Sequence, residues 1–307
     1  KRDLTKTTLT PPLGSGPYKI KSFEPNRSII YERVKDYWGS KLPVNKGRHN
    51  FDQIVYEYFR DGTVALEAFK AGRFDFRQEN SSKAWAIGYD VPAIEQGSLQ
   101  KRSFKHARTQ GMQGFVFNTR RQVFRDRKVR NALSYAFDFE WSNKTLFYNQ
   151  YTRTESYFAN SELAAPKTPS PQEIAILEPF RAKLPSEVFD ASYIAPRSDG
   201  SGNIRINLRK AKNLLNSAGW TFDRIQKKLI HQKTGFPFEF EILLVSPLFE
   251  RIVLPFKKNL EKLGITALVR TVDSAQYQKR TQNFDFDMVV MTWGQSSSPG
   301  NEQRMFW

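Results

Sequence analysis

The feature that most constrains the fold is a regular alternation of strand and helix patterns in the last third of the chain. The helical pattern "LRKAKNLLNSA" has Asn207 as its expected cap and Gly219 as its stop, and "LFERIVLPFKKNLEKL" ends at Gly264. Apolar residues dominate the strand patterns "FEFEILLVS" (238–246), "ITALVRTV" (265–272) and "FDFDMVVMTW". Strands that alternate with helices predict an α/β layer in which most strands are parallel.

Shorter elements precede this layer. Alternating apolar and polar residues predict strands within residues 14–37 and over 51–59. Asp61 is placed to cap a helix that Gly72 ends. Residues 160–203 are rich in Pro, Ser, Gly and Asn, which predicts a long loop with at most short helices.

Two further helices are predicted from spacing and caps. One covers "DRKVRNALSYAFDFE" (126–140), and the other is "SAQYQKRTQ", which Asp273 can cap. The side of the first helix that faces the core is formed by Val129, Leu133, Ala136 and Phe137. The outer side is cationic and is formed by Arg127, Lys128 and Arg130.

Composition limits the function classes. The 307 residues, 39% of them hydrophobic, suffice for about two domains of roughly 150 residues, and no apolar run is long enough to span a membrane. The absence of cysteine excludes disulfides, thiol catalysis and zinc–thiolate sites. The histidines His49, His106 and His231 are widely separated. We therefore expect no metal site and no cofactor.

Positive charge is the other compositional feature. Lysine and arginine number 48 against 31 acids, a net charge of +17, which suits nucleic acid, an anionic membrane or acidic ligands. The cations are scattered in "RRQVFRDRKVR", "NLRKAKNLL" and "PFKKNLEKL", mostly on polar faces of predicted helices, as is typical of a solvated surface. Because no RNP, KH or helix-turn-helix motif accompanies them, nucleic-acid binding is an alternative that the sequence does not favour.

Paired acids keep open a second alternative, a hydrolase. Asp285 and Asp287 lie two residues apart on a predicted strand and share one face, and Asp75 with Glu79 forms a second pair. An acidic pair at the start of an apolar strand is more typical of a structural role, so we favour a protein that is not an enzyme.

The loop "WGQSSSPG" follows the last predicted strand. In open α/β sheets, ligands bind beyond the carboxyl ends of the strands. Trp293 can stack on a ligand, and Gln295, Ser296, Ser297 and Ser298 can donate and accept hydrogen bonds. The loop is a candidate binding surface, with a plain polar connector as the alternative.

Four long blocks of sequence resemble the family 5 extracellular solute-binding proteins, the peptide and nickel receptors of ABC importers. They are "GSGPYKIKSFEPNRSIIYERVKDYWG", "FDQIVYEYFRDGTVALEAFKAGRFDF", "GFVFNTRRQVFRDRKVRNALSYAFD" and "NFDFDMVVMTW". "FEWSNKTLFYNQYTRTESYFANSELAAP" and "VDSAQYQKRTQNFDFD" are similar to the YejA-type, oligopeptide-binding branch. The resemblance implies a periplasmic receptor that captures oligopeptides, including those of cell-wall origin, for an inner-membrane ABC permease.

The resemblance also implies an α/β fold of the type II periplasmic-binding class, with two lobes, a hinge and a cleft. By analogy, residues 1–113 belong to the first lobe, 114–118 form a hinge strand and 119–307 form the second lobe, without a return to the first. Family members start with a signal peptide and are considerably longer. We therefore expect an internal section of a receptor, with an incomplete cleft that missing N- and C-terminal segments complete.

Residue roles carry over only in part. In oligopeptide receptors of this family, an Asp three positions after a Trp holds the peptide's amino terminus. The matching residue is Ser296, so we expect another acid to serve, with Glu162 of "NSELA" as candidate and a capping or surface role as its alternative. Met112 and Gln113 match cleft-facing positions, with interstrand packing as their alternative. The expected ligand-binding set is Trp293, Gln295, Ser296, Ser297, Met112, Gln113 and Glu162.

Overall fold

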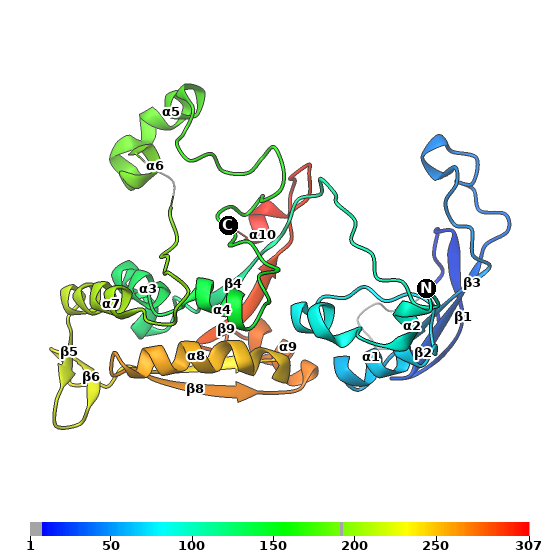
Figure 1. The fold of residues 1–307 in the computed structure, drawn as a ribbon. Helices are drawn as coiled ribbons and strands as arrows, with labels where there is room; N and C mark the ends of the chain where they lie inside the picture. Colours follow the sequence, from blue (N-terminus) through cyan, green and yellow to red (C-terminus); the bar gives the residue numbers. More distant parts are fainter. Residues whose placement is uncertain (1–7, 191–192, 307) are drawn as a thin grey trace. The chain divides into compact units, whose positions relative to one another are not determined.

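The computed structural model describes residues 8–190 and 193–306, and these divide into two compact units. The smaller unit comprises residues up to Asn80 together with Ile87–Lys101, and the larger comprises Ser81–Ala86 and the residues from Arg102 onward. Figure 1 labels the helices and strands of both units. The assignment of 1–113, 114–118 and 119–307 to lobes and hinge remains a prediction.

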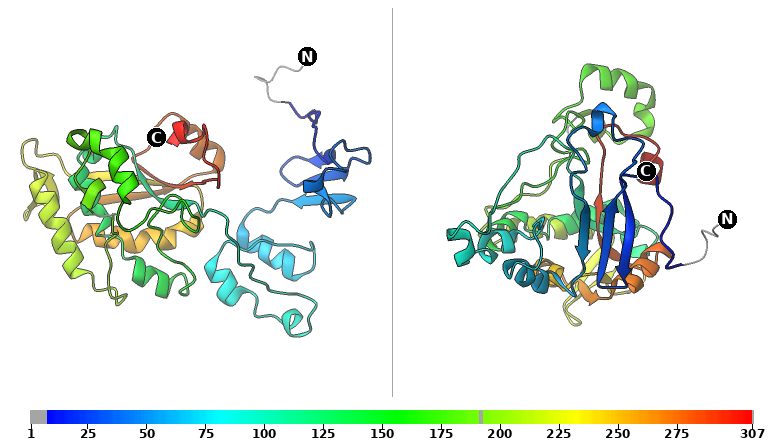
Figure 2. Two further views of the ribbon diagram at one scale, coloured as in Figure 1. Left: turned by 90° about the horizontal axis from the view of Figure 1, so that it is seen from above. Right: turned by 90° about the vertical axis from the view of Figure 1, so that its right-hand side faces the viewer.

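The smaller unit is built on a three-stranded antiparallel sheet, whose blue strands lie side by side in the right-hand view of Figure 2. Its strands are β1 (Tyr18–Glu24), β2 (Ser28–Arg33) and β3 (Gln53–Glu57), in that order. Its helical segments are η1 (Pro43–Asn45), α1 (Gly62–Lys70) and α2 (Pro92–Glu95), and the π-helical turn η2 (Ala84–Gly88) crosses the boundary between the units. The strands expected within 14–37 and 51–59 are confirmed.

Helix α1 begins and ends as predicted. The Asp61 side chain accepts hydrogen bonds from the backbone N–H groups of Thr63 (2.9 Å) and Val64 (3.0 Å), which would otherwise lack partners at the helix start. Gly72 follows the helix with φ of 70°, in the left-handed region that favours glycine. Leu66 is the buried residue of this helix.

The larger unit contains a four-stranded sheet in the order β4-β9-β7-β8. Strand β7 is parallel to both β8 and β9, whereas β4 is antiparallel to β9, so the mostly parallel α/β layer is confirmed. The strands are β4 (Met112–Phe117), β7 (Glu239–Leu244), β8 (Thr266–Thr271) and β9 (Met288–Trp293), and a separate ribbon pairs β5 (Trp220–Asp223) with β6 (Lys228–His231).

The helices of the larger unit fall into two groups. One group surrounds the sheet: α3 (Arg127–Ser134), α4 (Phe139–Thr145), α7 (Arg205–Ser217), α8 (Glu250–Glu261) and α9 (Ser274–Gln282). The other lies mostly in connections: η3 (Gln122–Phe124), α5 (Pro171–Leu177), η4 (Glu178–Lys183), α6 (Glu187–Asp190), η5 (Pro247–Phe249) and α10 (Gln303–Phe306). Among the described residues, no helix is long and apolar enough to cross a membrane.

The core of the larger unit lies between the sheet and helices α3, α7 and α8. Leu133, Leu215 and Phe256 of these helices pack with Ile242 and Met288 of the strands in one buried cluster. Each fully buried side chain of this size contributes about 1.5–3 kcal/mol. A smaller cluster on the other face joins Leu243, Phe286 and Val289, with Tyr277 of α9 packed against it.

Three sequence predictions need correction. The helix expected over 126–140 is two helices, because the Asp138 side chain accepts from the Trp141 N–H (3.1 Å) and starts α4. Asn207 does not cap α7; it is buried inside the helix, where its Nδ2 donates to the carbonyl of Arg197 (3.0 Å). Arg130 does not simply point outward, since its guanidinium donates to the carbonyls of Phe124 and Arg125, both at 2.7 Å.

Candidate ligand-binding site

The predicted site lies where β4 begins and β9 ends. In the antiparallel register, Met112 pairs with Trp293 and Gln113 with Thr292. Adjacent residues of a strand point to opposite faces, so Met112 shares the face of Trp293. Gln113 faces the other side, where its amide nitrogen Nε2 donates to the Thr292 hydroxyl (3.2 Å). A single cavity on one face of the sheet can therefore receive Met112 or Gln113, but not both.

A close approach of the backbone fixes this end of the strand pair. A Cβ atom at Gly111 would lie only 2.7 Å from the carbonyl oxygen of Trp293. A Cβ at Gly114, three residues further on, would have nothing within 4 Å. Gly111 is thus required where the chain passes over the end of β9, and Gly114 is not.

Two of the predicted residues, Glu162 and Ser297, line one hollow of about 480 Å³ in the larger unit. We call it the Glu162 hollow; its lining residues are Ala107, Asn160, Ser161, Glu162, Leu163 and Ser297. The lining contains one carboxylate and no lysine or arginine, although the chain as a whole carries +17. Among the described residues, no ion pair engages Glu162, so its carboxylate is available to a ligand.

Asn160 holds the two walls of the hollow together. It has φ of 62°, and its Nδ2 donates to the carbonyls of His106 (3.0 Å) and Arg108 (2.9 Å). The carbonyl of the neighbouring Ala159 accepts a hydrogen bond from the backbone N–H of Gln110 (2.8 Å). Both amide hydrogens of Asn160 are thereby used, so only its oxygen remains to bind a ligand, as an acceptor.

The other loop residues serve the loop itself. The Ser296 hydroxyl donates to the carbonyl of Ser298 (2.7 Å) and accepts from the Ser298 N–H (3.2 Å). The Gln295 carbonyl oxygen Oε1 accepts from Gln303 of α10 (2.6 Å). Gln295 and Ser296 therefore shape the loop that presents Ser297.

An aromatic contact supports the same region. The ring of Tyr157 meets the Trp293 ring edge-on at 5.8 Å between centroids. Burial raises the pKa of the Tyr157 hydroxyl. Sequence reasoning missed Tyr157 and Asn160, and the signal that could have indicated them is "SYFAN", an aromatic pair followed by an asparagine that readily adopts positive φ.

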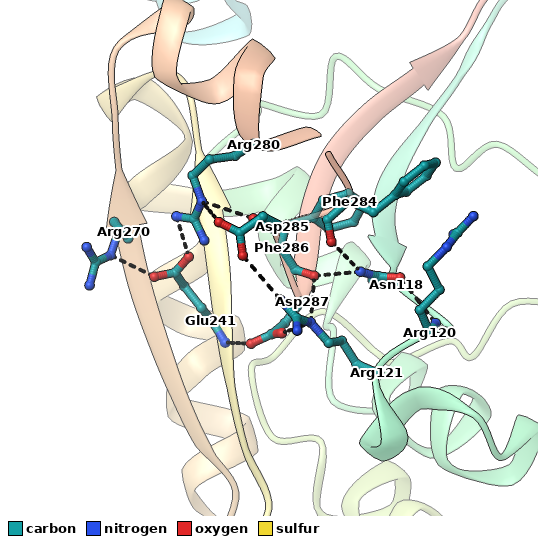
Figure 3. Close-up of polar contacts among 10 residues, drawn as sticks. All are labelled: Asn118, Arg120, Arg121, Glu241, Arg270, Arg280, Phe284, Asp285, Phe286 and Asp287. Carbon is teal, nitrogen blue, oxygen red and sulfur yellow. Dashed lines mark hydrogen bonds and ion pairs between the residues drawn. The ribbon is translucent and has the colours of Figure 1, made fainter. Parts of the chain in front are cut away.

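The acids that a hydrolase would need are engaged in an ion-pair network (Figure 3). Arg121 lies 2.9 Å from Asp287 and 3.4 Å from Asp285, measured between guanidinium nitrogen and carboxylate oxygen. Asp285 also pairs with Arg280 (3.2 Å), and Asp287 accepts from the backbone N–H of Glu241 (2.8 Å). Both carboxylates therefore tie the start of β9 to its neighbours.

A turn with unusual backbone geometry, beside the network, also holds the start of β9 in place (Figure 3). Phe284 has φ of 53°, unusual for a bulky residue. Asn118 at the end of β4 fixes it by donating from Nδ2 to the carbonyls of Phe284 (3.0 Å) and Phe286 (2.8 Å). The Arg120 guanidinium lies 3.7 Å from the centroid of the Phe284 ring, within cation–π range.

The second acid pair, Asp75 and Glu79, belongs to the smaller unit. Glu79 Oε2 accepts from Arg77 Nε (3.0 Å) and from the Tyr89 hydroxyl (2.8 Å). Burial, together with the Glu79 carboxylate, raises the pKa of Tyr89 to about 12. Glu79 is thus an acceptor within a packed cluster.

Comparison with known proteins supplies the family. The model of the bacterial extracellular solute-binding proteins, family 5 middle region, matches residues 1–307. The probable peptide-binding protein YejA of Agrobacterium fabrum is 44% identical over 308 residues, which cover 100% of this chain and 50% of that protein. The peptidoglycan-binding protein YepA of the same organism is 38% identical over 97% of this chain and 49% of its own length.

A solved structure agrees on the fold. The oligopeptide-binding protein AppA of Bacillus subtilis, in complex with a nonapeptide, superposes with a TM-score of 0.66 at 22% identity, over 93% of this chain and 48% of that one. The expected type II periplasmic-binding fold is confirmed, and the chain spans about half the length of the curated relatives it matches. The family is one of solute-binding receptors and not of enzymes. The chain belongs to the bacterial extracellular solute-binding proteins of family 5.

Proposed function

We propose that the whole receptor captures oligopeptides in the periplasm and delivers them to an inner-membrane ABC permease. In this proposal, 1–113 and 119–307 are parts of two lobes joined by the strand 114–118, and segments beyond this chain complete the cleft. The relative from Agrobacterium fabrum named as a probable peptide-binding protein, 44% identical, supports the ligand class. The relative named as a peptidoglycan-binding protein supports the inclusion of cell-wall peptides.

The observation that carries the proposal is the chemistry of the Glu162 hollow. A peptide presents an ammonium group, N–H donors and carbonyl acceptors, whatever its side chains are. The hollow offers an unpaired carboxylate at Glu162, the Asn160 amide oxygen and the Ser297 hydroxyl. The aromatic pair of Tyr157 and Trp293 lies close in sequence to these residues, outside the lining itself. Groups of this kind bind a peptide backbone while tolerating varied side chains.

Within this proposal, Glu162 contacts the amino terminus of the peptide. It is the one carboxylate in the lining, and Ser296, the position that the family resemblance suggested for an acid, uses its hydroxyl within the loop. An ammonium–carboxylate contact in a partly open site is expected to favour binding by about tenfold. Met112, Gln113 and Gln295 are positioning residues in this account rather than direct contacts.

The first experiment is native mass spectrometry of the full-length receptor, isolated from periplasm without denaturation and then unfolded to release its ligand. Copurified peptides support the proposal and reveal whether they come from the cell wall. The same protein is then titrated calorimetrically with a randomised tetrapeptide library and with a murein tripeptide. A receptor that carries no peptide and binds neither probe refutes oligopeptide capture.

A substitution tests the role of Glu162. Glu162→Gln should reduce the preference for free over N-acetylated tetrapeptides by about tenfold. The matched control is Glu155→Gln, which removes the same charge from the same segment, where Glu155 pairs with Arg197 at 2.8 Å outside the hollow. If both variants keep the wild-type preference, the amino terminus binds elsewhere even though peptide capture stands.

A further inference from the structure

The larger unit carries a region of concentrated positive charge that the ligand site does not use. We call residues 205–236 the basic arm; it consists of α7, the β5–β6 ribbon and the turn after the ribbon, and Figure 1 shows α7 and the ribbon next to each other. Eight lysines and arginines and one acid, Asp223, occur in it. The Asp223 carboxylate accepts from the N–H groups of Ile225 (2.7 Å) and Gln226 (3.1 Å), so it is bound to the ribbon turn.

The cations of the basic arm are exposed and largely unpaired. Buried Ala211 and Leu215 fix which side of α7 faces the core, so the opposite side is the solvent side. That side and the ribbon expose Arg205, Arg209, Lys210, Lys212, Arg224, Lys227 and Lys233. Lys228 pairs with Glu239 (2.7 Å); in the described part of the chain, no ion pair engages the other seven.

Large apolar side chains project from the same segment. Ile206, Ile225 and Phe236 are 65%, 95% and 68% exposed. Ile225 lies at the turn of the ribbon, directly after Arg224 and two residues before Lys227. Single exposed apolar residues are ordinary, but apolar side chains interleaved with unpaired cations are typical of segments that lie at a membrane interface.

We propose that the basic arm binds the surface of an anionic phospholipid membrane. Cations near such a surface are attracted by its negative potential, and an apolar side chain at the turn can enter the boundary between headgroups and acyl chains. The cations sit on long, flexible side chains. Four of them lie on α7 within the stretch 205–212, and Arg224, Lys227 and Lys233 lie on the ribbon and the turn after it. Such an array suits a fluid layer of phosphates better than the fixed acids of a protein partner.

The proposal concerns a surface separate from the Glu162 hollow, whose lining comes from residues 107, 160–163 and 297. It therefore stands or fails independently of peptide capture. Its consequence for the receptor is residence at the membrane face, where a permease is found.

The test is co-sedimentation of the full-length receptor with vesicles. One set is phosphatidylcholine alone, and the other contains about one-third phosphatidylglycerol, at physiological salt. We expect binding to the anionic vesicles only. The triple variant Arg209→Gln, Lys212→Gln, Arg224→Gln should bind about a hundredfold more weakly, since each cation near the surface contributes about fivefold.

Two controls separate a local surface from general charge and from other polyanions. The triple variant Lys105→Gln, Lys183→Gln, Lys279→Gln removes the same charge from exposed positions outside the basic arm and should bind nearly as the wild type does. Ile225→Asn keeps the charge and should still weaken vesicle binding several-fold. The proposal is overturned if both triple variants lose binding equally, or if the receptor does not bind anionic vesicles. It is also overturned if Ile225→Asn binds vesicles with unchanged affinity and the receptor binds soluble polyglutamate equally well.

Discussion

Gly111→Ala should loosen the end of the β4–β9 pair that carries Trp293. The new Cβ atom would lie 2.7 Å from the carbonyl oxygen of Trp293, whereas ordinary van der Waals contact begins at 3.4 Å, so the two backbones must separate by the difference, about 0.7 Å. The same Cβ would be 3.2 Å from the Thr292 methyl and 3.3 Å from the Gly294 Cα, which leaves little room to move sideways. Overpacking of this kind costs about 1–3 kcal/mol.

Gly114→Ala, inside β4, is the matched control for Gly111, which directly precedes that strand. Its Cβ meets nothing within 4 Å, and Gly114 does not have positive φ. Replacing this glycine should leave stability unchanged or raise it by about 0.4–1 kcal/mol, because the unfolded chain loses freedom. The two alanines should thus differ by about 1–4 kcal/mol although they lie three residues apart.

Hydrogen exchange followed by mass spectrometry measures this difference locally. In the full-length receptor, amides of β4 and β9 should exchange roughly 5–150 times faster in Gly111→Ala than in wild type, and no faster in Gly114→Ala. Unchanged protection in Gly111→Ala, or greater loss in Gly114→Ala, would show that the strand end tolerates the side chain and that the close approach does not determine the site.

Three further predictions concern packing and titration. Asp287→Ala should lower the free energy of unfolding by about 1–3 kcal/mol, because it leaves the Glu241 N–H without its acceptor and removes the shorter of the two ion pairs of Arg121. Asp285→Ala, at a more exposed carboxylate, should cost under about 1 kcal/mol, and urea unfolding compares the two variants. Tyr89, with its pKa raised to about 12, should ionise after ordinary tyrosines in an ultraviolet titration. Since the folded pKa exceeds the unfolded value, the stability that this hydroxyl contributes is complete below about pH 10 and is lost as the pH rises toward 12, and Tyr89→Phe should remove that loss. Asp61→Ala should destabilise α1 by about 1 kcal/mol, seen as faster exchange of the Thr63 and Val64 amides.

Helix starts that depend on one nearby side chain could be predicted from the sequence. Asp61 and Asp273 accept from N–H groups two or three residues away, as a local capping rule requires. The prediction of a single helix over 126–140 was wrong by the same rule, because Asp138 is also a capping residue and starts a second helix. The prediction that Asn207 caps α7 was wrong for another reason. The Asn207 amide donates to the carbonyl of Arg197, ten residues upstream, and no local pattern encodes that contact.

The candidate ligand site could be proposed from the sequence as a set of polar residues and not as a cavity. Ser297 and Glu162 line the same hollow although 135 positions separate them in the numbering. The Asn160 side chain joins the segment that carries Glu162 to the wall at Ala107, because it bonds two carbonyls more than fifty residues upstream, at His106 and Arg108. A sequence pattern identifies groups that can bind a ligand; the long-range bonds that assemble those groups are visible only in the fold.

One strand pair positions both the structural acids and the candidate ligand site. At the start of β9, Asp287 and Arg121 anchor the strand to the rest of the sheet. At its end, Trp293 faces Met112 and leads into the loop that presents Ser297. The strand between them has six residues, about 20 Å long, which keeps the anchoring charges away from the hollow. The paired acids that suggested a hydrolase thus hold one end of the strand, so that the neutral loop at the other end can be positioned with a free carboxylate at Glu162.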